Sequence, residues 1–135
     1  MRPELRDEVR GWVVKTENDL RAAERLLGGD EPILDAAVCH CQQAAEKALK
    51  AFLALHESPF AKTHSLPALV WQCVDIDETF SALRDAAEFL NPFATRFRYP
   101  GELLEPDPDE ARGAFDRARE TADFVYSRMP ETIRS

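Results

Sequence analysis

The sequence lacks any apolar stretch of the roughly 18 to 20 residues that a membrane-spanning helix requires. Its first ten residues, MRPELRDEVR, also lack the apolar core of a signal peptide. We therefore expect a cytoplasmic protein. No segment alternates between apolar and polar residues with period two, and none is enriched in Val, Ile and Thr as strands are. These absences favour an all-α fold.

The motifs of common enzymes are missing as well. We find no nucleophile elbow, no phosphate-binding Walker loop, no dinucleotide-binding glycine pattern and no HExxH zinc motif. The sequence therefore gives no support to hydrolase, NTPase, dehydrogenase or zinc-protease chemistry, and we expect no cofactor beyond a nucleotide ligand.

Cysteine is scarce, with only Cys39, Cys41 and Cys73 in the chain. An odd number without a disulfide framework indicates free thiols in a reducing compartment. Cys39 and Cys41 lie two residues apart on a predicted helix, so their side chains point about 200° apart and cannot bind one ion unless the helix unwinds. We expect neither a disulfide nor a metal site.

Basic residues are outnumbered, with 17 Lys and Arg against 25 Asp and Glu and a formal net charge of -8. Such an acidic protein repels phosphate backbones, which disfavours non-specific binding of RNA or DNA. A local basic patch remains open, because Lys47, Lys50 and Lys62 form one group in the sequence and Arg96 and Arg98 another.

The 135 residues, 44% of them hydrophobic, suffice for one domain over 1–135 with its own core. Apolar residues recur with helical spacing in four long segments, 3–27, 30–56, 78–91 and 108–129, and in a short one, 66–73. We expect an antiparallel up-and-down bundle of four long helices plus one short helix.

Local signals mark several ends of these helices. A Gly-Gly pair follows the first helix, and Pro92 ends or kinks the fourth. Either Thr63 or Ser65 can cap the short helix. At the last helix Asp107 can act as the cap, with Glu110 completing a capping box.

The second predicted helix has an unusually broad apolar face. Its members are mostly small: Ala37, Cys41, Ala44, Ala45, Ala48, Phe52 and Leu55, widened by Val38, Leu49 and Leu53. Small side chains allow neighbouring helices to approach closely, and so wide a face exceeds what one helix–helix contact needs. The helix is therefore central or shared with another subunit, and we expect a homodimer.

A polar stripe flanks this apolar face, because His40, Gln43 and Lys47 lie on one side of the helix. These side chains could hold a phosphate, a base edge or a carboxylate of a partner. In the alternative interpretation they are simply solvated, His40 is a histidine at the edge of the bundle, and Glu46 pairs with Lys50 one turn later.

A second candidate group follows the fourth helix, in the segment NPFATRFRYPG. Arg96 and Arg98 could donate bidentate hydrogen bonds to a phosphate while Tyr99 stacks on a base. Alternatively, Phe97 and Tyr99 close the end of the bundle and the arginines pair with surface acids.

The order of the motifs resembles the HEPN domain family, over about residues 15–129. The resemblance rests on QQAAEKALKAFL in the second helix, then KTHSLPAL, then an RYP element after the fourth helix, and an acid-capped final helix. It implies an up-and-down bundle of four to five helices, commonly a homodimer, often encoded beside a small nucleotidyltransferase subunit that is its partner.

Several branches of this family are ribonuclease toxins of toxin–antitoxin pairs, with an arginine followed four to six residues later by histidine. This sequence has no histidine after His64, so the group that would transfer protons in that motif is missing. The resemblance instead implies a non-catalytic module that binds a nucleotide or a nucleotidyltransferase. The matching residues are Gln43, Lys47, Lys62, His64, Arg98 and Tyr99. A ribonuclease toxin and a purely structural dimer are the alternatives.

Overall fold

The structure, a computed structural model, describes residues 1–60, 62–97, 100 and 105–134. Every regular element in these ranges is a helix, which confirms the predicted all-α class. The elements are α1 (Pro3–Leu27), α2 (Leu34–Leu55), α3 (Leu66–Ile76), the 3-10 helix η1 (Glu78–Leu83), α4 (Arg84–Leu90), the 3-10 helix η2 (Asn91–Ala94), α5 (Pro108–Tyr126) and α6 (Glu131–Arg134).

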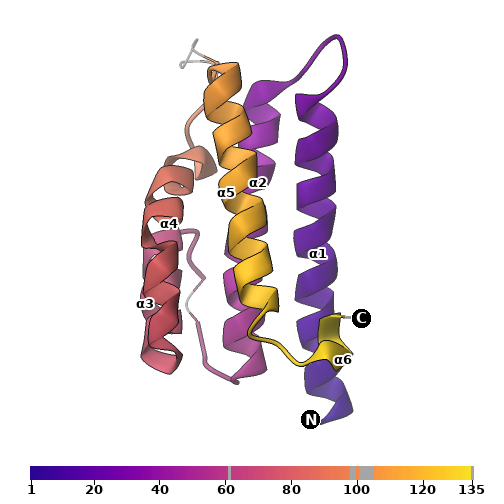
Figure 1. The fold of residues 1–135 in the computed structure, drawn as a ribbon, viewed down its shortest axis with the longest axis vertical. Helices are drawn as coiled ribbons and strands as arrows, with labels where there is room; N and C mark the ends of the chain where they lie inside the picture. Colours follow the sequence, from indigo (N-terminus) through magenta and orange to yellow (C-terminus); the bar gives the residue numbers. More distant parts are fainter. Residues whose placement is uncertain (61, 98–99, 101–104, 135) are drawn as a thin grey trace.

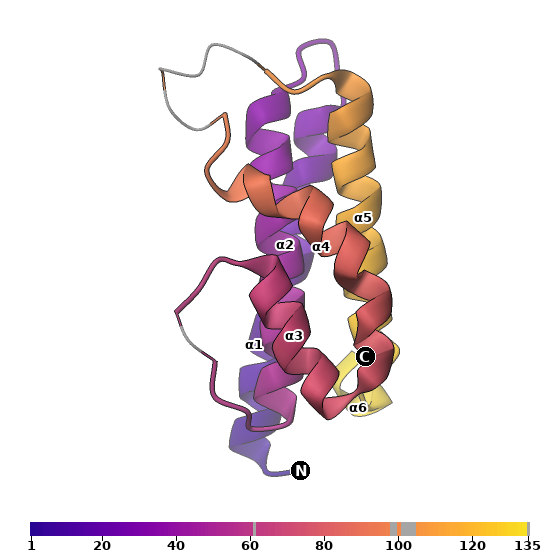
Figure 2. The ribbon, with the colours of Figure 1, turned by 90° about the vertical axis from the view of Figure 1, so that its left-hand side faces the viewer.

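The three longest helices, α1, α2 and α5, lie side by side along the long axis of the molecule (Figure 1). The shorter α3 and α4 cover one side of α2, as the view in Figure 2 shows. The chain direction alternates from α1 to α2, then to the η1–α4 segment, and then to α5. The short α3 runs alongside α2. This is the predicted up-and-down arrangement.

The second helix is the centre of the bundle. It packs against α1, α5, α3, α4 and η2, and its alanines Ala44, Ala45 and Ala48 are buried. Contacts within one chain therefore account for the breadth of its apolar face. The homodimer stays a prediction, and it now requires a surface other than this face.

The fourth predicted helix is present but is not one regular α-helix. It begins as η1, continues as α4 and ends as η2 at Ala94. Asp77 caps η1 by accepting a hydrogen bond from the backbone N–H of Thr79 at 3.0 Å. Phe80 and Leu83 are both buried, and residues three apart share one face when the helix has three residues per turn. The apolar spacing therefore suits the tighter helix.

The capping predictions have specific outcomes. Ser65 caps α3 through its hydroxyl, which accepts from the backbone N–H of Ala68, and α3 extends to Ile76 rather than residue 73. Asp107 caps α5 by accepting from the N–H of Asp109 at 2.8 Å. The last long helix ends at Tyr126, before Met129.

Two buried thiols lie inside the bundle. Burial raises the pKa of Cys41 and of Cys73 to about 12, while Cys39 is only half-buried. Within the described ranges no three His, Cys, Asp or Glu side chains gather as a metal-binding group. None of the helices described here has the length and apolar character needed to cross a membrane.

Candidate functional site

Two buried carboxylates, one on α1 and one on α2, are each shared between a lysine and a histidine of the segments around α2. Asp19 of α1 is 6% exposed and Glu46 of α2 is 7% exposed. Carboxylates are seldom buried unless they are paired, so each must be compensated by donors. The two clusters around them contain most of the polar residues predicted on the second helix.

The Asp19 cluster joins α1 to α2. Oδ1 of Asp19 lies 2.9 Å from Nδ1 of His40, and Oδ2 accepts from Nζ of Lys47 at 2.7 Å. His40 and Lys47 are seven residues apart, two turns of α2, so both reach the same carboxylate from one helix side. Two of the three residues of the predicted polar stripe, His40 and Lys47, are therefore directed at a neighbouring helix. The third, Gln43, donates to Sγ of Cys39 on α2 itself.

The Glu46 cluster joins α2 to the segment before α3. Oε2 accepts from Nζ of Lys50 at 3.0 Å, and Oε1 lies 3.0 Å from Nδ1 of His64 and 3.3 Å from Nε2 of Gln42. Burial alone would raise the pKa of Glu46, but the hydrogen bonds from these three residues outweigh it and hold the pKa below the ordinary 4.5. Glu46 is therefore ionised at neutral pH.

His64 is held in place by its surroundings although its side chain is 81% exposed. An ionised carboxylate only accepts hydrogen bonds, so Nδ1 of His64 carries the hydrogen and Nε2 is left for another partner. The backbone is fixed too: Gln42 donates to the carbonyl of His64 at 3.0 Å. The next helix begins two residues later, where the N–H of Leu66 donates to Asn91 at 3.0 Å.

A pocket of about 330 Å³ opens beside this cluster. It is lined by Gln42, Gln43, Glu46, Lys47, His64 and Ala94. It therefore brings together three of the predicted site residues, two from α2 and one from the segment before α3. We call this the α2 pocket.

The other predicted site residues lie elsewhere. His40 contacts Asp19 and does not line the α2 pocket, and Lys62 is exposed on the segment before α3. Arg96 lies 4.0 Å from Glu110 and its guanidinium is 4.8 Å from the ring centroid of Phe97, as in the alternative interpretation. Arg98 and Tyr99 lie outside the described residues.

The sequence analysis did not identify Asp19, and it did not predict that Glu46 is buried. Asp19 is three residues after Thr16 and four before Ala23, both in the buried stripe of α1, so its position at the edge of that stripe was the available signal. The Glu46–Lys50 pair was expected, but as a solvated pair. It is buried because the segment carrying His64 lies across it.

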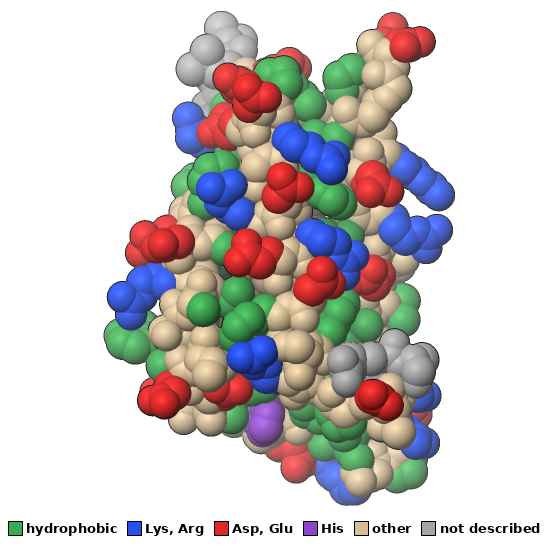
Figure 3. Space-filling view, viewed as in Figure 1, with side chains coloured by type: hydrophobic (Ala, Val, Ile, Leu, Met, Phe, Trp, Pro, Cys, Tyr) green, Lys and Arg blue, Asp and Glu red, His purple; other side chains and the backbone are tan. Residues whose placement is uncertain are grey.

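The charges of the site are nearly balanced. The two ammonium groups of Lys47 and Lys50 face two carboxylates, so these lysines form no strongly positive patch. On the face shown in Figure 3, Lys and Arg side chains are interspersed with Asp and Glu in the same way. A ligand of the α2 pocket must therefore be held by directed hydrogen bonds more than by a long-range field.

The architecture defines an all-helical bundle whose central helix carries a polar pocket on its flank. The family model of the HEPN domain matches residues 9–129 of the 135, and the chain belongs to the HEPN domain family. The crystal structure of an archaeal HEPN homologue is similar, with a TM-score of 0.69 and 23% sequence identity over 89% of this chain and 96% of that chain. No curated protein sequence matches.

Proposed function

We propose that this HEPN chain is a non-catalytic binding module that holds a nucleotide in the α2 pocket. One observation carries the proposal: Gln43, Lys47 and His64, expected from sequence to bind a nucleotide, line the same pocket. Its volume of about 330 Å³ is at the lower end of the range of small-molecule sites. That size suits one nucleotide.

The donors of the pocket fit the groups of a nucleotide. An ammonium group has three N–H donors, and Asp19 accepts from Lys47, so the others can meet a phosphate oxygen. Nε2 of His64 and the amide of Gln43 can pair with the polar edge of a base or with the ribose. The phosphate is therefore expected at Lys47.

The test is calorimetry with mono- and triphosphates of the four common bases. Replacing Lys47 alone would leave buried Asp19 with one partner fewer, so we compare Asp19→Asn with the double variant Asp19→Asn and Lys47→Ala. A charge-assisted contact contributes about 1.5 to 3 kcal/mol, so the double variant should bind at least tenfold more weakly. Lys15→Ala in the same background is the control, because Lys15 is exposed on α1.

Binding that is unchanged in the double variant would remove Lys47 from the site. Absence of heat with every nucleotide tested would end the nucleotide proposal. Gln43→Ala gives a second arm, because Gln43 takes part in neither ion-pair cluster: its amide donates to Sγ of Cys39. This variant should weaken binding while the free energy of unfolding changes little.

The proposal includes two partners that the resemblance supports, a second copy of the chain and a small nucleotidyltransferase. Light scattering at micromolar concentration should give twice the mass of one chain. A single-chain mass would exclude the homodimer without affecting the nucleotide site. Co-purification with a nucleotidyltransferase encoded beside this chain tests the other partner.

A ribonuclease is the second candidate function, and one observation favours it. The Glu46 carboxylate orients the exposed imidazole of His64 beside Lys47, and an oriented imidazole can transfer protons in RNA cleavage. The sequence lacks the arginine–histidine motif of ribonuclease branches. Cleavage of an RNA oligonucleotide by the wild type and its loss in His64→Gln would establish this function, and no cleavage by the wild type would exclude it.

A further inference from the structure

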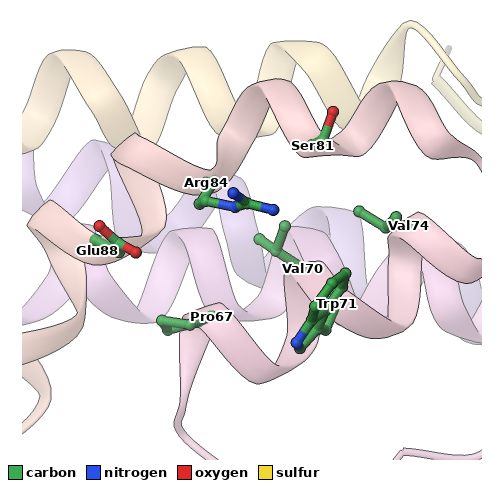
Figure 4. A pocket seen from close by; sticks show the side chains of 7 residues that line it. All are labelled: Pro67, Val70, Trp71, Val74, Ser81, Arg84 and Glu88. Carbon is green, nitrogen blue, oxygen red and sulfur yellow. The ribbon is translucent and has the colours of Figure 1, made fainter.

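An apolar groove lies on the side of the bundle formed by α3, η1 and α4, and it shares no lining residue with the α2 pocket. Figure 4 shows its lining: Pro67, Val70, Trp71 and Val74 from α3, facing Arg84 and Glu88 from α4. The pocket within it has a volume of about 320 Å³. We call it the Trp71 groove.

Trp71 is the most exposed of the large apolar side chains that the structure describes, at 64% of its full surface. Single apolar side chains scattered over a protein surface are ordinary, but an exposed indole beside an apolar pocket marks a candidate binding surface. Pro67 and Val74, both partly exposed, extend its apolar surface along two turns of α3, and buried Val70 lies at the base between them. Covering this surface would be favourable.

A cation lies over the apolar groove. The guanidinium of Arg84 is 5.9 Å from the ring centroid of Trp71, and in Figure 4 it extends between the two helical segments. Among the described residues Arg84 forms no ion pair, in contrast to Lys47, Lys50 and Arg119, which are all paired. The chain has 25 acidic residues, yet this arginine over the exposed tryptophan pairs with none of those that the structure describes, so it can bind an anionic group of another molecule.

The shape of the groove indicates what it can accommodate. Pro67 and Val74 are seven residues apart, so the groove is about 10 Å long at 1.5 Å per helical residue. Two turns of a partner helix fit that length and would place two or three apolar side chains against it. Among the described residues of the lining, Arg84 is the one cation; it can pair with a single carboxylate, whereas a nucleic-acid backbone needs several cations along its phosphates.

We propose that the Trp71 groove binds an acidic amphipathic helix of a partner protein. Leucine-like side chains of that helix cover Trp71 and Val74, and one of its carboxylates pairs with Arg84. The groove is separate from the α2 pocket, so this proposal does not depend on nucleotide binding. It assigns a protein-docking surface to the α3–α4 side of the bundle.

Trp71 itself provides the readout for a test. The chain has two tryptophans, and Trp12, half-buried against Phe60, can be replaced by Phe to leave Trp71 as the only indole. The probe is a blocked helical peptide of Glu-Ala-Leu-Leu repeats, and its matched control is the same peptide with Lys in place of Glu. The acidic peptide should shift the Trp71 emission to shorter wavelength, and the basic peptide should not.

Charge reversal tests the role of Arg84. Arg84→Glu, in the same Trp12→Phe background, should weaken binding of the acidic peptide roughly tenfold or more and create binding of the basic one. Arg21→Glu on α1 is the control, since Arg21 is exposed and does not line the groove. Its preference for the acidic peptide should be unchanged.

Three results would overturn the proposal. One is an emission that neither peptide shifts, and another is an acidic-peptide affinity that Arg84→Glu leaves unchanged. The third is an equal, Arg84-dependent shift with a single-stranded RNA oligonucleotide, which would assign the groove to nucleic acid. If Arg84→Glu instead dissociates a dimer of the protein alone, the occupant is a second copy and the acidic-partner assignment is wrong.

Discussion

Replacing Glu46 with glutamine removes the negative charge between Lys50 and His64 with almost no change in volume. The ammonium group of Lys50 then stays in a site where its side chain is only 10% exposed, opposite a neutral amide. Removing one partner of a buried ion pair typically costs about 3 to 5 kcal/mol, because the other charge is left uncompensated. The lost contact with His64 adds little to this cost, since the His64 side chain is largely exposed.

We expect the lower end of this range, about 3 kcal/mol, in the free energy of unfolding. Nζ of Lys50 already lies 5.6 Å from the ring centroid of Phe60, so the long side chain retains one favourable contact after the substitution. For a domain of this size such a loss lowers the melting temperature by about 10 °C. Urea unfolding followed by circular dichroism measures it.

The chain offers a matched control in Asp116, which forms the same kind of pair one turn from Arg112 at 3.7 Å but in solvent. Asp116→Asn should cost less than about 1 kcal/mol, as exposed pairs do. Adding Lys50→Met to Glu46→Gln should recover part of the loss, because no charge is then left buried. A Glu46→Gln loss as small as that of Asp116→Asn would refute the reasoning.

The pH dependence and the thiols give two further predictions. Because the pKa of folded Glu46 lies below 4.5, its contribution to stability is complete above the unfolded-state pKa and is lost as pH falls towards the folded-state value. Urea unfolding below about pH 4.5 should show this loss, and it should be smaller in Glu46→Gln. Ellman's reagent at neutral pH should modify only Cys39 in the folded chain, because Cys41 and Cys73 are buried with pKa values of about 12; modification of all three would contradict the described packing.

The helices could be predicted because their signals are local. The apolar spacing of α1 and the Gly-Gly pair after it define the bounds Pro3–Leu27, and Gly29 has the positive φ of 81° that glycine readily adopts. The 3-10 form of residues 78–83 was not predictable in this way. Phe80 and Leu83 fit both helix types, and only their packing in the folded chain selects one.

The site could be predicted only in part, because half of it depends on tertiary contacts. Gln43 and Lys47 were identified from the polar stripe, and His64 from the family resemblance. The partner of Lys47 was not, because Asp19 is 28 residues away and meets it only when α1 packs on α2.

The small residues of α2 connect its packing to the site. An aspartate side chain has only one methylene group, so Asp19 reaches His40 and Lys47 only if α1 lies close to α2. Ala44 is one turn from His40 on the same side of the helix and is fully buried, which allows that approach.

Ala44→Leu should therefore have two effects. Overpacking should reduce the free energy of unfolding by about 1 to 3 kcal/mol, and the separation of α1 from α2 should weaken the Lys47–Asp19 ion pair. Asp19→Asn should then cost less in the Ala44→Leu background than in the wild type, a non-additivity that a double-mutant cycle from urea unfolding measures. Strictly additive losses would mean that the close approach at Ala44 is not what brings Asp19 to Lys47.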